Sequence, residues 1–138
     1  MNGAEYDPRT ALTAGVSIKP GTELSGTTAA EGDWIDLGDA SVTPIVNAAC
    51  MTGSATGSPS SYSVTFKLRE ADSSGGSGAQ DCTIKTDAVH TADKKHSFAT
   101  GRRTKRYVQV VATPAFTGGA GPKVHVSASV LATAYKAG

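Results

Sequence analysis

The feature that most restricts how this chain can fold is a series of short segments in which apolar and polar residues alternate. The clearest covers residues 62–70, where Val64, Phe66 and Leu68 fall on one side and polar residues on the other. An alternation with a period of two places the apolar side chains on one face of a β-strand. We therefore expect this segment to be a strand with one face in a hydrophobic core.

Seven further segments are expected to form strands, because turn-forming residues separate them. Pro20 and Gly21 should end the first, and Pro114 should end the strand that precedes it. The Gly-rich stretch 72–78 is expected to be a flexible loop that does not pack, and only residues 90–95 hint at a helical turn. The seven segments are residues 15–19, 34–37, 42–51, 82–86, 97–100, 106–113 and 124–132.

Eight short strands at regular spacing indicate a sandwich rather than a parallel sheet. Gly, Ser and Thr make up about a third of the 138 residues, so strong helix formers are few. No apolar run approaches the roughly 20 residues that a membrane-spanning helix needs, and no heptad repeat is visible. The expected fold class is all-β: a jelly-roll-like antiparallel β-sandwich over residues 15–138, preceded by an extended, flexible N-terminal arm in residues 1–14.

Two cysteines, Cys50 and Cys82, lack the spacing of metal ligands and are too few for a disulfide framework. We expect both to be buried thiols of a protein made in a reducing cytosol. A disulfide would require neighbouring strands with Cα atoms within about 7 Å. The first residues also lack the charged and apolar regions of a cleaved secretion signal, so secretion by that route is not expected.

Charge is distributed unevenly along the chain, although the formal net charge is only +1. Residues 1–45 carry seven acids and two bases, whereas residues 80–138 carry nine bases and three acids. An acidic N-terminal part and a basic C-terminal part can form complementary contacts between copies or with a charged partner.

The most unusual segment is residues 94–107, which holds six cations and no acid. Docking on an acidic protein surface and a solvated hairpin are the two main interpretations. Contact with nucleic acid is less favoured, because only Phe98 and Tyr107 are available for base stacking. Together with Tyr6 and Arg9 of the arm, the candidate contact residues are Lys94, Lys95, Arg102, Arg103, Lys105 and Arg106.

No group of residues indicates catalysis. His90, His96 and His125 have no partner at metal-ligand spacing, and His125 is interpreted as a surface residue. Asp33 and Asp36 are closely spaced acids, but a solvated strand rim is preferred over an acid–base pair. No nucleophile elbow, phosphate-binding loop or zinc-protease motif occurs. We expect no enzymatic activity, no cofactor and no metal.

Three parts of the chain resemble small structural proteins of tailed bacteriophages. Residues 62–76 read YSVTFKLREADSSGG, residues 104–114 read TKRYVQVVATP, and a strand of small residues follows a Gly-rich turn. The similarity covers the C-terminal half well and the N-terminal third poorly. Within this group the chain is most similar to the capsid cement, or decoration, proteins, such as that of a short-tailed Bordetella phage.

The resemblance implies a jelly-roll sandwich on the exterior of the virion, after synthesis in the host cytoplasm. It implies a homodimer or homotrimer without catalytic residues that clamps neighbouring subunits of an HK97-like major capsid protein. Many weak contacts on one lattice give strong binding. The eight contact residues named above become capsid-contact candidates, with no membrane partner and no nucleic acid expected. Two alternatives remain open: a soluble β-sandwich binding module and a tail-associated phage structural protein.

Overall fold

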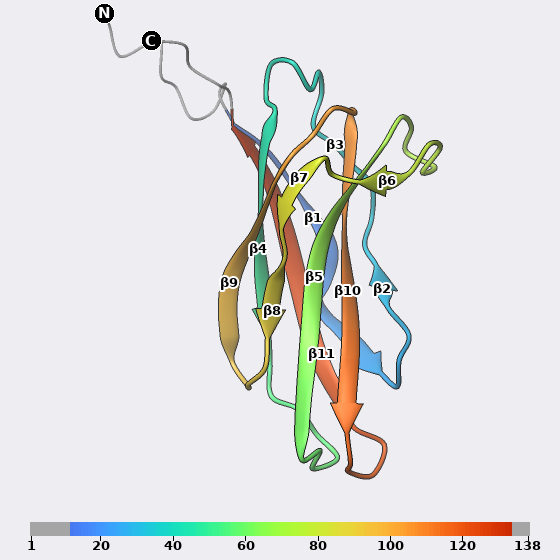
Figure 1. Ribbon diagram of the computed structural model, residues 1–138, viewed down its shortest axis with the longest axis vertical. Helices are drawn as coiled ribbons and strands as arrows, with labels where there is room; N and C mark the ends of the chain where they lie inside the picture. The colour runs from blue at the N-terminus through green and yellow to red at the C-terminus, as the bar shows by residue number, and fades with distance from the viewer. Residues whose placement is uncertain (1–11, 134–138) are drawn as a thin grey trace, which may run out of the picture.

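The computed structural model describes residues 12–133, which form eleven β-strands (Figure 1). The strands are β1 (Leu12–Ser25), β2 (Ala30–Glu31), β3 (Ile35–Asp36), β4 (Ile45–Thr52), β5 (Ser61–Ala71), β6 (Gln80–Asp81), β7 (Ile84–Thr86), β8 (Ala88–His90), β9 (Lys95–Arg102), β10 (Tyr107–Thr117) and β11 (Lys123–Thr133). The expected all-β class is confirmed. Among the described residues, no helix has the length and apolar character needed to cross a membrane.

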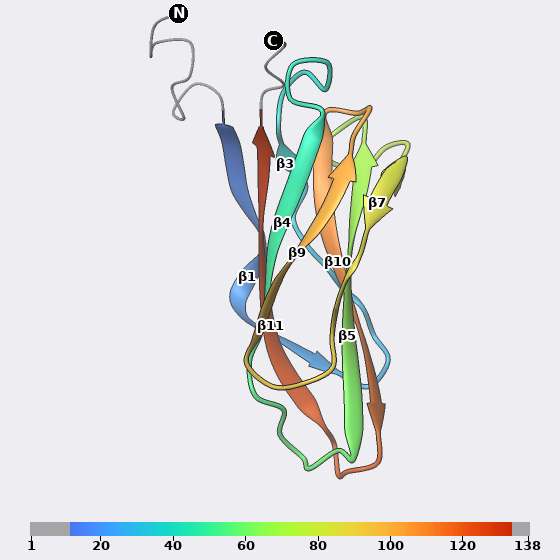
Figure 2. The ribbon, with the colours of Figure 1, turned by 60° about the vertical axis from the view of Figure 1, so that its left-hand side comes forward.

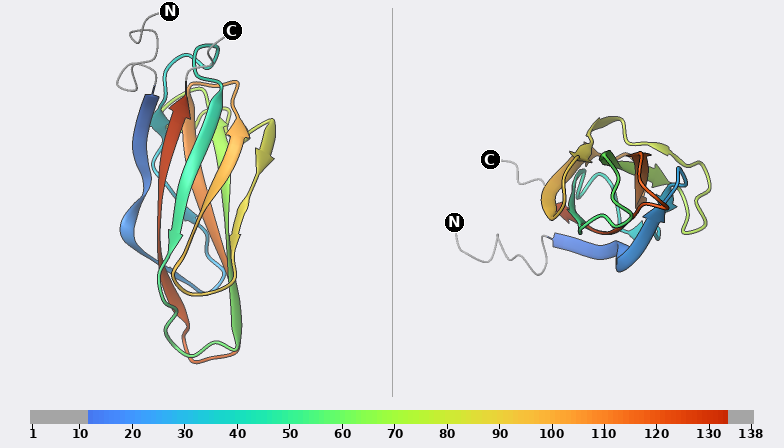
Figure 3. Two further views of the ribbon diagram at one scale, coloured as in Figure 1. Left: turned by 90° about the vertical axis from the view of Figure 1, so that its left-hand side faces the viewer. Right: turned by 90° about the horizontal axis from the view of Figure 1, so that it is seen from below.

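The strands form two antiparallel sheets that pack face to face and surround a common interior (Figure 3). The first sheet has the order β1-β11-β4-β9-β7. The second has the order β2-β10-β5-β6, with β3 also pairing with β10 and β8 with β5. Successive strands such as β4 and β5, or β10 and β11, therefore belong to opposite sheets. The expected antiparallel sandwich is confirmed, and its finer description as a jelly roll stays a prediction.

The core lies between the two sheets and consists of alternate residues from each long strand. In β5 the expected inward side chains, Val64, Phe66 and Leu68, are at most 1% exposed. Alternate residues of β11, from Val124 to Ala132, are likewise buried. Burying a Leu or Phe side chain contributes about 1.5–3 kcal/mol, so the alternation predicted the strands that hold the fold together.

Both cysteines are buried free thiols, as expected. Cys50 lies on β4, and Cys82 lies just before β7. Burial raises the pKa of Cys50 to about 11 and that of Cys82 to about 12. Because the thiolate is the reactive form, both residues act as small core side chains at neutral pH.

The first strand is longer than expected at both ends. β1 begins at Leu12, inside the residues assigned to the arm, and continues past Pro20 and Gly21. Two shifts in its register with β11, on either side of Ile18, allow the strand to bend without ending. Residues 1–11, which contain most of the expected arm with Tyr6 and Arg9, lie outside the described residues.

β10 runs through Pro114 to Thr117, although proline was expected to end it. The N–H and C=O groups of Val110 face the β2 side of the strand, where they bond to Ser17 and Gly32. By the period of two, the nitrogen of Pro114 faces that same side, and the pairing with β2 already ends at Ala112. The missing N–H therefore removes no sheet hydrogen bond.

Two loops also differ from expectation. Residues 90–95 form no helical turn, because His90 ends β8 and Lys95 begins β9. The loop 72–78 packs against Trp34, since a Cβ atom added at Gly76 would lie 2.9 Å from the Trp34 indole nitrogen. Gly76 has a φ of 84°, so both its conformation and its surroundings require glycine.

Leu12 and Thr133 are direct partners in the first sheet, so the described chain starts and stops at one end of the sandwich (Figure 2). We call this the terminal end. The pairing continues from Thr133 to Ile45 of β4 and from Ile45 to Arg102 of β9. Lys95, at the other end of β9, pairs with Thr52 at the opposite end of the sandwich.

Candidate functional site

The six cations of residues 94–106 do not form one surface, because β9 separates them. Lys94 and Lys95 lie at the opposite end, and the other four lie at or beyond Arg102 at the terminal end. Seven residue steps of about 3.3 Å place the two groups roughly 23 Å apart. The structure therefore places Lys94 and Lys95 in one group and the other four cations in a second group at the terminal end, and it keeps the two groups apart.

Arg103 is not a surface residue, and its prediction as a contact candidate is wrong. Its side chain is only 2% exposed and donates to the Thr43 hydroxyl and to six backbone carbonyls. Those carbonyls belong to Leu37, Gly38, Asp39, Thr43, Lys105 and Arg106, at distances of 2.8–3.3 Å. Arg103 thus fastens the loop between β3 and β4 to the loop between β9 and β10.

Glu70, at the inner side of β5, is a second buried charge at this end, and the sequence did not single it out. It is 0% exposed and accepts hydrogen bonds from the backbone N–H and the hydroxyl of Thr104, at 2.7 and 2.9 Å. The Gln80 amide donates a third bond at 2.7 Å. Glu70 and Arg103 together hold the loop 103–106 in place.

Lys105 and Arg106 are partly neutralised within the chain. The Lys105 ammonium lies 3.2 Å from the Asp72 carboxylate, and the Arg106 guanidinium lies 2.7 Å from that of Asp36. The hydrogen bond from Arg106 lowers the pKa of Asp36, which places this acid in an ion pair rather than in a catalytic pair. No described ion pair involves Lys94, Lys95 or Arg102 within residues 12–133.

The outer face of the first sheet is the feature that the sequence reasoning missed. Seven large apolar side chains are exposed in the described part of the chain, and five of them point outward from this sheet. We call this surface the apolar face. Its large members are Val16 at 46%, Ile45 at 36%, Met51 at 53%, Ile84 at 66% and Phe98 at 56% exposure.

The register of the strands places small residues between these large ones. Phe98 pairs with Ala49, which pairs with Ser129, which in turn pairs with Val16. The phenyl ring of Phe98 meets the His96 ring edge-on, with centroids 5.4 Å apart. The centre of the apolar face is therefore lined by small side chains, and the larger side chain of Phe98 protrudes beside it.

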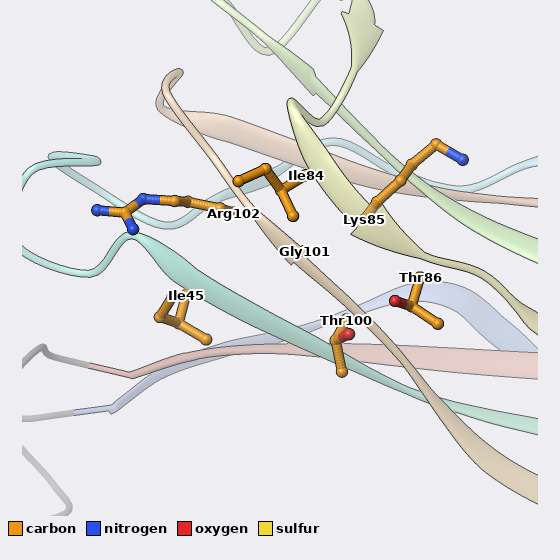
Figure 4. A pocket seen from close by; sticks show the side chains of 7 residues that line it. All are labelled: Ile45, Ile84, Lys85, Thr86, Thr100, Gly101 and Arg102. Atoms are coloured by element: carbon orange, nitrogen blue, oxygen red, sulfur yellow. The ribbon is translucent and has the colours of Figure 1, made fainter.

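A shallow hollow of about 260 Å³ lies on the apolar face near the terminal end (Figure 4). Ile45 and Ile84 lie on either side of β9, and Thr86 and Thr100 complete the hollow on the β7 side. Lys85, by contrast, pairs with Asp87 at 2.8 Å. Among the outward positions of β4, β7 and β9 that line the hollow, only Arg102 carries a charge, and its guanidinium extends away from Thr86 and Thr100.

The sequence predicted a turn at His90, but this residue joins the two sheets instead. It is 2% exposed, and its Nδ1 and Nε2 atoms lie 2.7 Å from the hydroxyls of Thr52 and Ser97. Burial lowers its pKa, with smaller contributions from His96 and Lys95. His125 is exposed near Glu23, which confirms its interpretation as a surface residue.

Residues 12–133 bring no three His, Cys, Asp or Glu side chains close enough to hold a metal ion. Two features of this part of the molecule therefore stand out. One is the buried hydrogen-bond network of Arg103 and Glu70 at the terminal end, and the other is the exposed apolar face beside it. The hydrogen-bond network is buried and holds loops in place, whereas the apolar face is accessible to a partner. The apolar face is therefore the stronger candidate for a functional site.

No family model and no curated protein matches this chain. Three solved structures are similar at low identity. They are the SPBc2 prophage-derived protein YomS (12% identity, TM-score 0.40, covering 87% of this chain and 92% of that one), FLHE (11%, 0.44, 91% and 99%) and Eiger TNF from S. frugiperda (10%, 0.45, 93% and 96%). One of these neighbours is thus a prophage-derived protein, but TM-scores below 0.5 carry no argument about function.

Proposed function

We propose that this chain is a structural protein of a phage virion that binds the exterior of an assembled capsid and clamps neighbouring major capsid subunits. The sequence resemblance to capsid cement proteins suggests the class. The apolar face supports it, because a surface that exposes several large apolar side chains often marks a protein contact. The proposed role needs no catalytic residue, cofactor, metal or membrane.

The partners in this proposal are an HK97-like major capsid protein and further copies of the chain, as a homodimer or homotrimer. Copies held on one lattice bind through many weak contacts, so single contacts need not be strong. The chain would be made in the host cytoplasm and act on the outside of the shell.

The terminal end is the end that we assign to the capsid. Arg102 lies there without an ion-pair partner among the described residues, in the same row of the first sheet as Leu12. Three strand spacings of about 4.8 Å place Arg102 roughly 14 Å from the point where residues 1–11 join the sheet. Arg102 can therefore contact an acidic partner surface at this end, and Tyr6 and Arg9, which lie outside the described residues, remain candidate contacts.

The test is co-sedimentation with expanded shells assembled from the major capsid protein of the same phage. Arg102→Glu should weaken binding at least about tenfold, because it reverses an interfacial charge. Lys95→Glu is the matched control, since it reverses an exposed charge at the opposite end of the same strand. Its binding should stay within about twofold of wild type.

Failure of the wild-type protein to sediment with shells would remove the proposed function. If Arg102→Glu and Lys95→Glu lost shell binding equally, the proposed function would stand, but the assignment of the terminal end as the capsid-binding end would be overturned. Binding to phage tails in place of shells would favour the tail-associated alternative.

A further inference from the structure

We propose that the apolar face is the surface through which this chain binds a second copy of itself. The inference deepens the proposed function, which involves a homo-oligomer, by assigning the residues that form the contact. It rests on four properties of the face: its charge, its relief, its area and the position of Phe98.

The charge of the apolar face favours a copy of the same chain over a partner selected by charge. From the row of Ile45 to the row of Met51, the outward positions of β4, β7 and β9 carry one formal charge, that of Arg102 at the edge. A partner recognised by its charge would need several complementary groups. The charged residues of β1 and β11, which are Lys19, Glu23 and Lys123, lie at or beyond the row of Met51. A surface without charge at its centre is complementary to itself, because two copies bring no like charges together there.

The relief of the face suits the insertion of side chains. A second hollow, of about 220 Å³, lies at the opposite end of the face beside Met51 and Ser127. Both hollows are smaller than the roughly 300–1,000 Å³ of typical small-molecule sites. They match protruding side chains of a protein partner better than a separate ligand, and the face itself supplies such side chains in Phe98, Met51 and Ile84.

The area of the face is sufficient for a specific contact. At about 4.8 Å between strands and 3.3 Å per residue, four strands that contribute about eight residues each and the three-residue β7 cover roughly 550 Å². Two copies would then bury about 1,100 Å², which exceeds the roughly 1,000 Å² expected of a biological interface and lies in the range of weak, transient contacts. We therefore expect a reversible association rather than an obligate one.

Phe98 is the residue expected to anchor this contact. It is 56% exposed next to the small side chain of Ala49, and its ring is supported by His96. An aromatic side chain near the middle of an interface carries a large share of the binding energy. Its exposure in the single chain makes it available without any rearrangement of the sheet.

The experiment compares two substitutions at equally exposed apolar residues. Phe98→Glu places a charge on the apolar face, and Val89→Glu places one on β8 of the second sheet, where Val89 is 57% exposed. Sedimentation velocity of the full chain is recorded from about 2 to about 200 µM, since mass action makes assembly depend on concentration. Wild type and Val89→Glu should associate alike, and Phe98→Glu should associate at least about tenfold more weakly.

A wild-type protein that stays monomeric throughout this range would overturn the inference, as would equal association of all three proteins. Ile84→Glu is the second variant, and it should weaken association as Phe98→Glu does. Circular dichroism shows whether each variant is folded. Shell binding by a monomeric wild type would leave the proposed function standing without this inference, whereas association in solution without shell binding would leave only the inference.

Discussion

The outer faces of the two sheets differ in chemistry, although the long strands of both sheets alternate in the same way. On the second sheet, Lys67 and Arg69 of β5 lie 3.4 and 3.7 Å from the Asp81 carboxylate, and Arg69 also lies 3.9 Å from Glu31. On the first sheet, the outward positions between the row of Ile45 and the row of Met51 carry mostly apolar and small side chains, and the ion pair of Glu23 with Lys123 lies beyond them at the opposite end. The second sheet has a surface suited to water, whereas the first has one that gains free energy when a partner covers it.

This difference shows that the two sides of one strand can have separate roles. Inward residues of both sheets determine the stability of the chain, and outward residues of the first sheet determine what the chain contacts. We call the outer side of the second sheet the polar face. The comparison predicts that substitutions on the apolar face change association but not folding, while substitutions on the polar face change neither strongly. Three further predictions test it, in order of decreasing effect.

The largest effect is expected for neighbouring arginines that lie inside and outside the sandwich. Arg103→Met removes every hydrogen bond that this side chain donates to the loop 37–43 and leaves buried carbonyls without those donors, which should lower the free energy of unfolding by about 3 kcal/mol. Arg102→Met changes an exposed side chain and should lower it by less than about 0.5 kcal/mol. Urea unfolding measures both, and similar values for the two variants would contradict the assignment of inside and outside.

An intermediate effect is expected from the histidine that joins the sheets. Burial holds the pKa of His90 below its ordinary value of 6.5, so the unfolded chain binds more protons between the two values. The free energy of unfolding should therefore fall as the pH drops from 7 to 5, by at most about 1.4 kcal/mol per pH unit. The carboxyl groups of Asp36, Asp39 and Asp93 have lowered pKa values and affect stability only near and below 3.8.

Urea unfolding at pH 7 and pH 5 provides the measurement. His90→Gln should flatten this pH dependence, and His125→Gln, at an exposed position, should retain it. A wild-type protein with equal stability at both pH values would show that His90 does not couple the sheets to pH.

The smallest effect is expected on the polar face. Asp81→Asn removes the acid shared by Lys67 and Arg69, but these groups are solvated, so the free energy of unfolding should fall by less than about 1 kcal/mol. The difference should shrink further in high salt. Association should be unchanged in sedimentation velocity, and a loss comparable to that of Phe98→Glu would remove the contrast between the faces.

The sequence predicted the strands whose two faces differ, and it did less well where both faces are apolar. Residues 62–70 and 124–132 alternate cleanly, so their inward side chains could be named in advance. In β4 both the inward Val46 and the outward Ile45 and Met51 are apolar. That pattern is typical of a strand covered on both faces, and it was the available signal for the apolar face.

The remaining features depend on contacts that no local pattern contains. Ile45, Ile84 and Phe98 come from three separate segments and become neighbours only through the order β4-β9-β7. Arg102 and Arg103 are adjacent and identical in type, yet one lies outside the sheet and the other bonds to residues about 60 positions earlier. Predicting their different roles requires the pairing of β9 with β4, which spacing along the chain does not reveal.

The edges of the two sheets determine what kind of complex the apolar face can build. β7 has three residues and β2 and β6 have two each, while the long edge strand β1 is interrupted by register shifts near Ile18. Short or interrupted edge strands of this kind disfavour strand addition at the edges of the described sheets. Copies crowded at high density can therefore meet through side chains and form a finite assembly without polymerising into amyloid.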